Sequence, residues 1–261
     1  MDDLPPQESD SPSPFPKLRD IDASRPFLWL SLAVGDMRAH PGPSLFYGCC
    51  FALLGFVTTW VFRNAYPYLS AVICGSLLLG PVLCMGLYEI SRLHEQRQAC
   101  HLLSTLAVWR RNLGNIGILA VVLGIAFLVW ARASMVIFAL FYESAIPTLN
   151  VFLVQVVSLD NLRFLAIYCV VALLFLSIAF AISVVSIQLM LDRNQDAITA
   201  VIASVATLLR NPVSMLIWAL IIFFMTIAGF ATFNLGHIVL MPLVGHAAWH
   251  AYRDAIEPPA C

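Results

Sequence analysis

The stretches Arg38-Ala39-His40-Pro41, Arg110-Arg111-Asn112-Leu113 and Leu209-Arg210-Asn211-Pro212 mark three steps from a short amphipathic segment into a long apolar one. Before the third step, apolar residues recur at the i, i+3, i+4, i+7 spacing of a one-sided helix: Ile198, Val201, Ile202, Val205, Leu208 and Leu209. Such a helix is expected to lie in a membrane interface, with its arginines toward lipid headgroups. The recurrence predicts three units, each made of one amphipathic helix and two membrane spans.

The composition predicts a protein embedded in a lipid bilayer. Of 261 residues, 61% are hydrophobic and 11% are charged, whereas a soluble domain carries about 25% charged residues. The net charge of −1 gives no argument for binding nucleic acid. The lipid bilayer is therefore the first expected partner.

Six stretches approach the roughly 20 apolar residues that a spanning helix needs; they lie near 44–62, 68–90, 113–131, 164–190, 213–232 and 235–252. With both termini in the cytoplasm, eleven of the fourteen Lys and Arg residues fall on the inner side. This split follows the positive-inside rule. The sequence thus predicts an all-α integral membrane protein with six spans and cytoplasmic termini.

The domain boundaries follow from the same pattern. Residues 1–26 are acidic and rich in proline, which predicts a disordered cytosolic tail. Residues 27–256 are expected to form one transmembrane domain with units at about 27–98, 99–196 and 197–256, followed by a short tail over 257–261. The middle unit carries an extra segment, 133–162, which we interpret as an interfacial or re-entrant insertion on the outer side. A pair of helices that extend beyond the membrane is the alternative.

Small residues in the returning spans predict close helix contacts. Gly80 and Gly86 flank Pro81 and the residues after it, and Gly245 follows Pro242. Glycine lets two helices approach closely within a membrane. Each proline removes a backbone hydrogen bond, so a neighbouring helix is expected to satisfy the freed carbonyl.

Polar residues end the returning span of each unit. Aligned at the helix exit, Glu89, Asp192 and His250 are equivalent, and one turn deeper lie Gln188 and His246. If the units pack around a common axis, these side chains meet at the inner membrane face. The candidate polar pocket consists of Glu89, Asp192, His250, His246, Gln188 and Tyr88.

A metal site is one alternative for part of this pocket. His246 and His250 stand four residues apart on one helix face, the spacing that lets two imidazoles share a metal ion. The other interpretation is a structural polar network, in which His250 bonds Asp254. The sequence predicts no cofactor, and metal or haem is the alternative. No catalytic residue is expected, since phosphate-loop, nucleophile-elbow, HExxH and dinucleotide motifs are absent from the sequence.

Several stretches carry a family resemblance: Val34-Gly35-Asp36, His40 to Gly48, Gly86 to Arg92 and Pro242 to Arg253. Over roughly residues 27–256 they resemble a bacterial family of integral membrane proteins, the domain of unknown function 2189. The resemblance implies a multi-span fold and no assigned activity. Gln188 stands where the family pattern has a proline.

Some members of that family carry a label as cytochrome c oxidase subunit I. Such a subunit needs six membrane histidines for two haems and a copper ion. This chain has six histidines, but only His237, His246 and His250 fall in predicted spans. The leading hypothesis is therefore a non-catalytic accessory, scaffold or assembly factor for another membrane protein complex. The alternatives are an ion or small-molecule transport pathway and a haem- or metal-binding accessory protein of respiration.

Overall fold

A computed structural model describes residues 15–64, 69–141 and 162–258 of the chain. The described residues form helices joined by short connections, and their only strand-like feature is an isolated bridge between Leu18 and Ile256. In chain order the helices are α1 (Arg25–Ala39), α2 (Pro41–Asn64), α3 (Leu69–Glu95), α4 (Leu102–Leu106), the 3-10 helix η2 (Val108–Asn112), α5 (Leu113–Phe141), α7 (Leu162–Ser183), α8 (Ser186–Arg193), α9 (Ala197–Arg210), α10 (Pro212–Ala231) and α11 (His237–Ala255).

Within these ranges, four helical stretches are long and apolar enough to cross a membrane: Pro41–Val61, Leu102–Phe141, Leu162–Arg193 and Pro212–Ala231. Their apolar side chains face outward to different degrees. The most apolar window of the third stretch is 0% buried and that of the second is 11% buried, against 33% for the first. The all-α class is thus confirmed, and the outward faces are those of helices that lipid surrounds.

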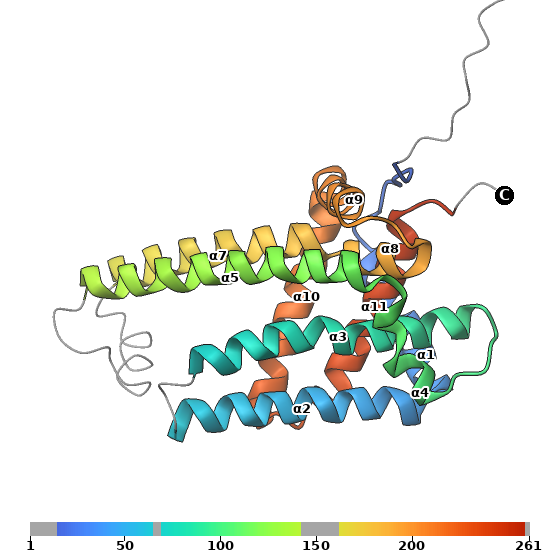
Figure 1. Cartoon of the computed structure of the whole chain (residues 1–261), viewed down its shortest axis with the longest axis horizontal. Coiled ribbons are helices and arrows are strands. Elements are labelled where there is room, and N and C mark those ends of the chain that lie inside the picture. Colours follow the sequence, from blue (N-terminus) through green and yellow to red (C-terminus); the bar gives the residue numbers. More distant parts are fainter. Residues whose placement is uncertain (1–14, 65–68, 142–161, 259–261) are drawn as a thin grey trace, which may run out of the picture.

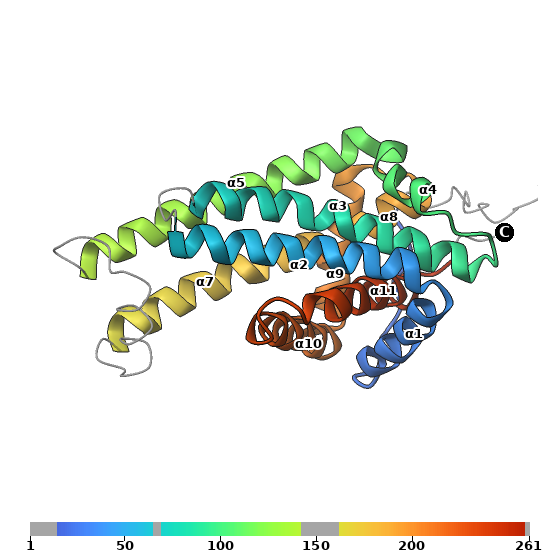
Figure 2. The same ribbon diagram turned by 90° about the horizontal axis from the view of Figure 1, so that it is seen from below.

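The long helices share one polar end. Figure 1 shows α1, α4 and α8 gathered near the C terminus, while α5 and α7 run side by side toward the opposite end. Figure 2, turned by 90°, shows the same hairpin of α5 and α7 projecting away from α1 and α11. Helix α11 contacts α1, α2, α3, α8 and α10, so it forms the centre of the packed end.

The first and third predicted junctions have the same backbone conformation. His40 has φ −129° and ψ 62°, and Asn211 has φ −125° and ψ 54°. In both, the junction N–H donates to the carbonyl four residues before it, and the junction carbonyl accepts from the N–H four residues after it. The proline that follows begins the next helix, where its missing N–H costs nothing. The middle junction differs, because α4 and η2 replace a single amphipathic helix there.

The predicted fourth span is broken near its inner end. We expected one helix over 164–190, but α7 ends at Ser183 and α8 begins at Ser186. The Ser204 hydroxyl accepts from the Val185 N–H at 3.2 Å and donates to the Ala181 carbonyl at 2.7 Å. It therefore occupies the place of the helical hydrogen bond between Ala181 and Val185, a known cause of helix breaks. The break comes from a side chain on α9, which the sequence of the span does not contain.

The predicted outer insertion over 133–162 does not begin where we expected. Helix α5 continues to Phe141, since no glycine or proline interrupts the chain between Ala126 and that residue. Its 29 residues correspond to about 44 Å, more than the roughly 30 Å of a hydrocarbon core. This part of the segment fits the alternative of extended helices. Residues 142–161 lie outside the described residues.

The predicted disorder of residues 1–26 is wrong for residues 15–26. The Arg19 N–H donates to the Ala255 carbonyl at 2.9 Å, and the Glu257 N–H donates to the Lys17 carbonyl at 3.0 Å. Asp20 also pairs with Arg210 at 2.6 Å. These partners lie about 190 positions or more away, so the local composition carries no trace of them. Residues 1–14 lie outside the described residues.

Glycines allow the closest helix approaches. A Cβ at Gly86 would meet the Tyr47 ring at 2.1 Å, and one at Gly245 would meet Leu87 at 2.4 Å, as the sequence predicts. The same prediction is wrong for Gly80, where a Cβ would meet no described atom within 4 Å.

The tightest approach joins α2 to α11. A Cβ at Gly48 would lie 1.9 Å from the Ile238 carbonyl oxygen, so the Cα hydrogen in that direction points at this oxygen. Ile238 lies four residues before Pro242, which has no N–H to donate to it. Gly48 therefore supplies a weak donor to the carbonyl that Pro242 leaves free.

We predict that Gly48→Ala lowers the free energy of unfolding by about 1–3 kcal/mol, the usual cost of overpacking, because a backbone carbonyl cannot move aside. Gly42→Ala on the same helix is the matched control, since its Cβ would meet no described atom within 4 Å. Thermal unfolding of both purified variants in detergent measures the difference. Equal midpoints for the two variants would contradict the close contact of α2 and α11.

Candidate functional site

The last three turns of α11 form the polar centre of the molecule. His246, Trp249 and Tyr252 are almost fully buried, and Ala247 and Ala251 between them let neighbouring helices approach. The polar side chains in these turns bond residues of four other helices, α1, α2, α3 and α8. A buried polar group costs free energy unless it is hydrogen-bonded, so these bonds fix how the elements are placed around α11.

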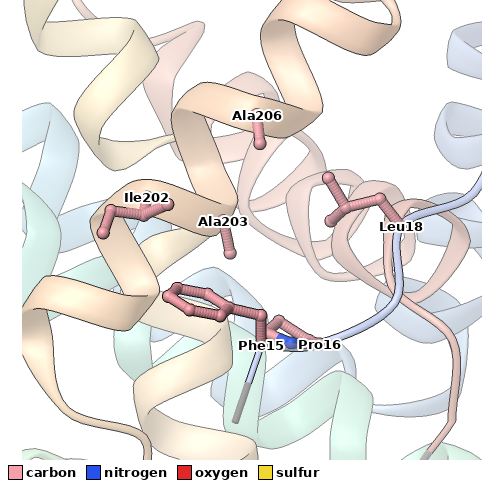
Figure 3. Close-up of a pocket in the computed structure, with 6 residues that line it drawn as sticks. All are labelled: Phe15, Pro16, Leu18, Ile202, Ala203 and Ala206. Atoms are coloured by element: carbon pink, nitrogen blue, oxygen red, sulfur yellow. The ribbon is translucent and has the colours of Figure 1, made fainter. Parts of the chain in front are cut away.

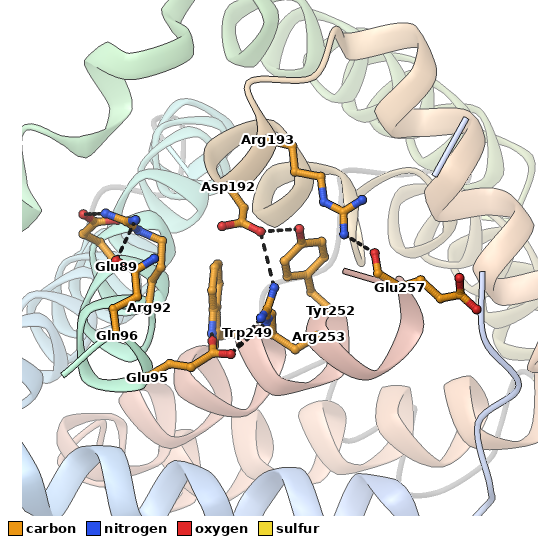
Figure 4. A network of polar contacts seen from close by, with 10 residues as sticks. All are labelled: Glu89, Arg92, Glu95, Gln96, Asp192, Arg193, Trp249, Tyr252, Arg253 and Glu257. Atoms are coloured by element: carbon orange, nitrogen blue, oxygen red, sulfur yellow. Dashed lines mark hydrogen bonds and ion pairs between the residues drawn. The ribbon is translucent and has the colours of Figure 1, made fainter. Parts of the chain in front are cut away.

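One side of α11 meets α8 (Figure 4). The Tyr252 hydroxyl donates to the Asp192 carboxylate at 2.6 Å, and the Arg253 guanidinium lies 3.7 Å from the same carboxylate. The neighbouring Arg193 donates to the Glu257 carbonyl, which ties α8 to the C-terminal segment. Asp192 thus accepts a hydrogen bond from the Tyr252 hydroxyl and pairs with the Arg253 guanidinium, and both groups belong to α11.

The same side of α11 also meets α3. Arg253 pairs with Glu95 at 2.8 Å, and the Trp249 indole N–H donates to Glu95 at 3.2 Å. Nearly two turns earlier on α3, Glu89 pairs with Arg92 at 2.7 Å and with Arg111 at 2.9 Å. Figure 4 shows Glu89 and Asp192 at separate places in this network of arginines and carboxylates.

The other side of α11 meets α1. The His250 Nε2 lies 2.9 Å from the Asp36 carboxylate, while His94 Nε2 and His246 Nδ1 lie 3.9 Å and 4.0 Å from it. The His40 ring stands edge-on to the His94 ring, with centroids 5.3 Å apart. We call these five residues, Asp36, His40, His94, His246 and His250, the Asp36–histidine cluster.

His246 is held from both sides at the bottom of this cluster. Its Nδ1 lies 2.7 Å from the Ser91 hydroxyl on α3, and its Nε2 lies 3.0 Å from the Ser44 hydroxyl on α2. The Ser91 hydroxyl in turn donates to the Asp36 carboxylate. The Ser44 hydroxyl also donates to the His40 carbonyl at 2.8 Å. His246 thereby connects α2, α3 and α1.

The environment favours a charged Asp36 and a neutral His40. Burial alone raises the pKa of Asp36, but the hydrogen bonds from His250 and Ser91 and the nearby imidazoles outweigh it, so the pKa lies below its ordinary value. Burial and the neighbouring His94 lower the pKa of His40.

The structure therefore divides the residues of the predicted pocket between two places. Glu89 and Asp192 lie in the arginine network, the set of arginine–carboxylate pairs that joins α3, α8 and α11 in Figure 4. His246 and His250 instead face Asp36. Gln188 is buried on α8, where its amide N–H groups lie 3.3 Å from the Val184 carbonyl and 3.4 Å from that of Ala248. Tyr88 is buried in the hydrophobic core. The predicted bond between His250 and Asp254 is absent from the described contacts of Asp254, whose carboxylate binds Arg25 and Trp29 instead.

Sequence reasoning missed Asp36, His40 and His94 as neighbours of the α11 histidines. Asp36 and His40 belong to α1 and its junction, which we treated as an interfacial helix only. A usable signal was present, since Asp36, His40, His246 and His250 all lie in stretches that carry the family resemblance. Three of these four are histidines, in a chain that has six.

Within the described ranges, no three His, Cys, Asp or Glu side chains are already arranged around a point that a metal ion could occupy. The cavity of the described residues that Figure 3 shows is of another kind. It measures about 310 Å³ and is apolar, lined by Phe15, Pro16, Leu18, Ile202, Ala203 and Ala206. It lies between the N-terminal segment and α9, away from both polar networks, so it adds no chemistry to them.

Comparison with known proteins supports the membrane assignment. Residues 68–192 match the model of a family described as "Predicted integral membrane protein (DUF2189)". The chain resembles this family. No curated protein and no solved structure matches the chain. The DUF2189 match contains the α3 and α8 carboxylates Glu89, Glu95 and Asp192, together with Ser91 and His94, whereas Tyr252 and Arg253 of α11 lie outside it. Asp36, His40, His246 and His250 lie outside the matched range.

Proposed function

We propose that the protein is a six-span accessory or scaffold protein of the bacterial inner membrane, without catalysis of its own. The observation that carries this proposal is the hairpin of α5 and α7. It leaves the packed end of the molecule and presents apolar side chains on almost every face. The proposed role is to pack this hairpin against the apolar helices of another membrane protein.

The span number is argued from where the helices begin and end. Asn234, in the turn between α10 and α11, donates to Thr59 near the far end of α2 at 3.2 Å. Asn211, at the start of α10, accepts from the Ile21 N–H at the polar end. If α10 crosses the membrane, α11 must therefore cross back to bring Ile256 beside Leu18. The same reasoning applies to α3, which returns from the far end of α2 to the polar end.

Two observations support cytoplasmic termini. The pairing of residues 17–19 with 255–257 supports an arrangement in which both ends of the described chain lie on one side of the membrane. The polar end also carries most of the arginines, whereas Arg63, Arg132 and Arg163 lie in or beside the opposite ends of the long helices. An excess of positive charge is typical of the cytoplasmic side.

The transport alternative receives no comparable support. Glu89, Asp192 and Glu95 are engaged by arginines and by Tyr252 and Trp249. The cavity in Figure 3 is lined by apolar side chains. The metal-binding alternative is supported by the Asp36–histidine cluster.

We predict that single cysteines in a cysteine-free variant report the crossings of α3 and α11, which the six-span arrangement adds to the four long apolar stretches. Asn64→Cys and Leu235→Cys, both at exposed positions, are expected to react with a membrane-impermeant maleimide added to intact spheroplasts. Gln98→Cys and Ser24→Cys are expected to react only after permeabilisation. Asn64 and Gln98 responding alike would contradict a crossing of α3, and Leu235 and Ser24 responding alike would contradict a crossing of α11.

We predict that a photo-reactive amino acid at Val121 or Val170 forms an adduct of defined mass with another membrane protein at native expression level. Phe224 on α10 is the matched control, since all three side chains are about equally exposed, at 62%, 66% and 62%. Gel analysis with mass spectrometry identifies the adducts. Lipid adducts alone at all three positions would contradict the accessory role, and adducts with a second copy would replace it by self-association.

A further inference from the structure

The Asp36–histidine cluster differs from the other acidic sites of the described chain. Glu89, Glu95, Asp192 and Asp254 each pair with at least one arginine. Asp36 is buried to a similar or greater degree, yet the ion-pair partners found for it in the described ranges are all imidazoles. Among these partly or fully buried acids of the described ranges, Asp36 therefore stands apart as the one surrounded by potential metal ligands.

We propose that Asp36, His94 and His250 bind one divalent transition-metal ion of the zinc class, with water in the remaining position. Imidazole nitrogen and carboxylate oxygen are ligands that such ions prefer. Three protein ligands with one open position is the arrangement found where a zinc ion stays accessible to solvent or substrate. This site is independent of the proposed accessory role.

The distances bring the donor atoms close to a coordination sphere. Two ligand atoms at about 2.0–2.1 Å from a tetrahedral ion lie roughly 3.3 Å apart. The Asp36 carboxylate lies 2.9 Å from His250 Nε2 and 3.9 Å from His94 Nε2. As they stand, these side chains do not yet surround an ion; binding requires rotations that open the Asp36–His250 pair by about 0.4 Å and close the Asp36–His94 pair by about 0.6 Å. Binding thus exchanges the hydrogen bond between His250 and Asp36 for two bonds to the metal.

Exposure provides an entry path for the ion. The His94 side chain is 44% exposed and that of His250 is 18% exposed, whereas Asp36 is 5% exposed. The carboxylate therefore forms the floor of the site, and the exposed imidazole of His94 its rim. Water can reach the open coordination position from the His94 side.

The floor of the site is already held in place. The Ser91 hydroxyl bonds both Asp36 and His246, and His246 is anchored on its other side by Ser44. Such outer hydrogen bonds orient a ligand and raise metal affinity. In this proposal His246 is a positioning residue, and His94 takes the place beside His250 that the sequence prediction gave to His246. His40 lies against His94 and orients its ring.

The test is titration of untagged, EDTA-treated protein in detergent with zinc chloride alone, followed by calorimetry. We expect one ion per chain, and at least a tenfold loss of affinity in His94→Gln and in His250→Gln. His101→Gln is the matched control, because His101 is exposed at the same end of the molecule and outside the cluster. Its affinity is expected to equal that of the parent.

Cobalt(II) supplies a spectroscopic readout that a purely structural role would not change. The parent and His101→Gln are expected to show the visible absorption of a four-coordinate cobalt site, and His94→Gln is expected to lose it at an unchanged thermal midpoint. Because His94 is largely exposed, this variant tests the site even if Asp36→Asn does not fold. Absence of saturable zinc binding by the parent, or equal affinities in His94→Gln and His101→Gln, would overturn the proposal.

Discussion

The bonds that the C-terminal turns of α11 make with their surroundings hold the rest of the structure in place. In a span-length helix, polar side chains are costly unless each finds a partner. Here Tyr252 finds Asp192 on α8, Arg253 finds Glu95 on α3, and His250 finds Asp36 on α1. The partners lie on three elements far apart in the chain, α1, α3 and α8. A rotation of α11 about its axis would break these bonds together, so they act as one constraint.

The same constraint divides the charges into two groups. On one side of α11, arginines neutralise the carboxylates of α3 and α8, which is a structural use of charge (Figure 4). On the other side, imidazoles surround Asp36 with groups that are weaker bases and good metal ligands. Pairing of the first kind lowers the cost of burying charge at a membrane surface. Around Asp36, the imidazoles leave the carboxylate without an arginine partner among the described residues. Ser91 and His246 cover it on the interior side, and the exposed His94 lies on the solvent side.

The sequence predicted those parts of the fold that depend on local pattern. Hydrophobic runs gave the long helices, and the His40-Pro41 and Asn211-Pro212 steps gave the first and third junctions. It did not predict features that need a partner from far along the chain. The break at Val184 and Val185 depends on Ser204, and the order of residues 15–24 depends on Asn211 and the segment at 255–257. The predicted grouping of the pocket residues was partly wrong for a related reason. Aligning residues at the helix exits does not show which side of α11 each residue faces.

A one-residue insertion in α11 tests the central constraint most directly. An alanine placed between Ala247 and Ala248 turns everything after it by about 100° and moves Tyr252, Arg253 and His250 off their partners together. An alanine placed between Val121 and Val122 in the lipid-facing hairpin is the control. The account predicts that the first variant loses its monodisperse gel-filtration peak or its thermal transition, while the second keeps both. Survival of the α11 insertion with an unchanged thermal midpoint would contradict it.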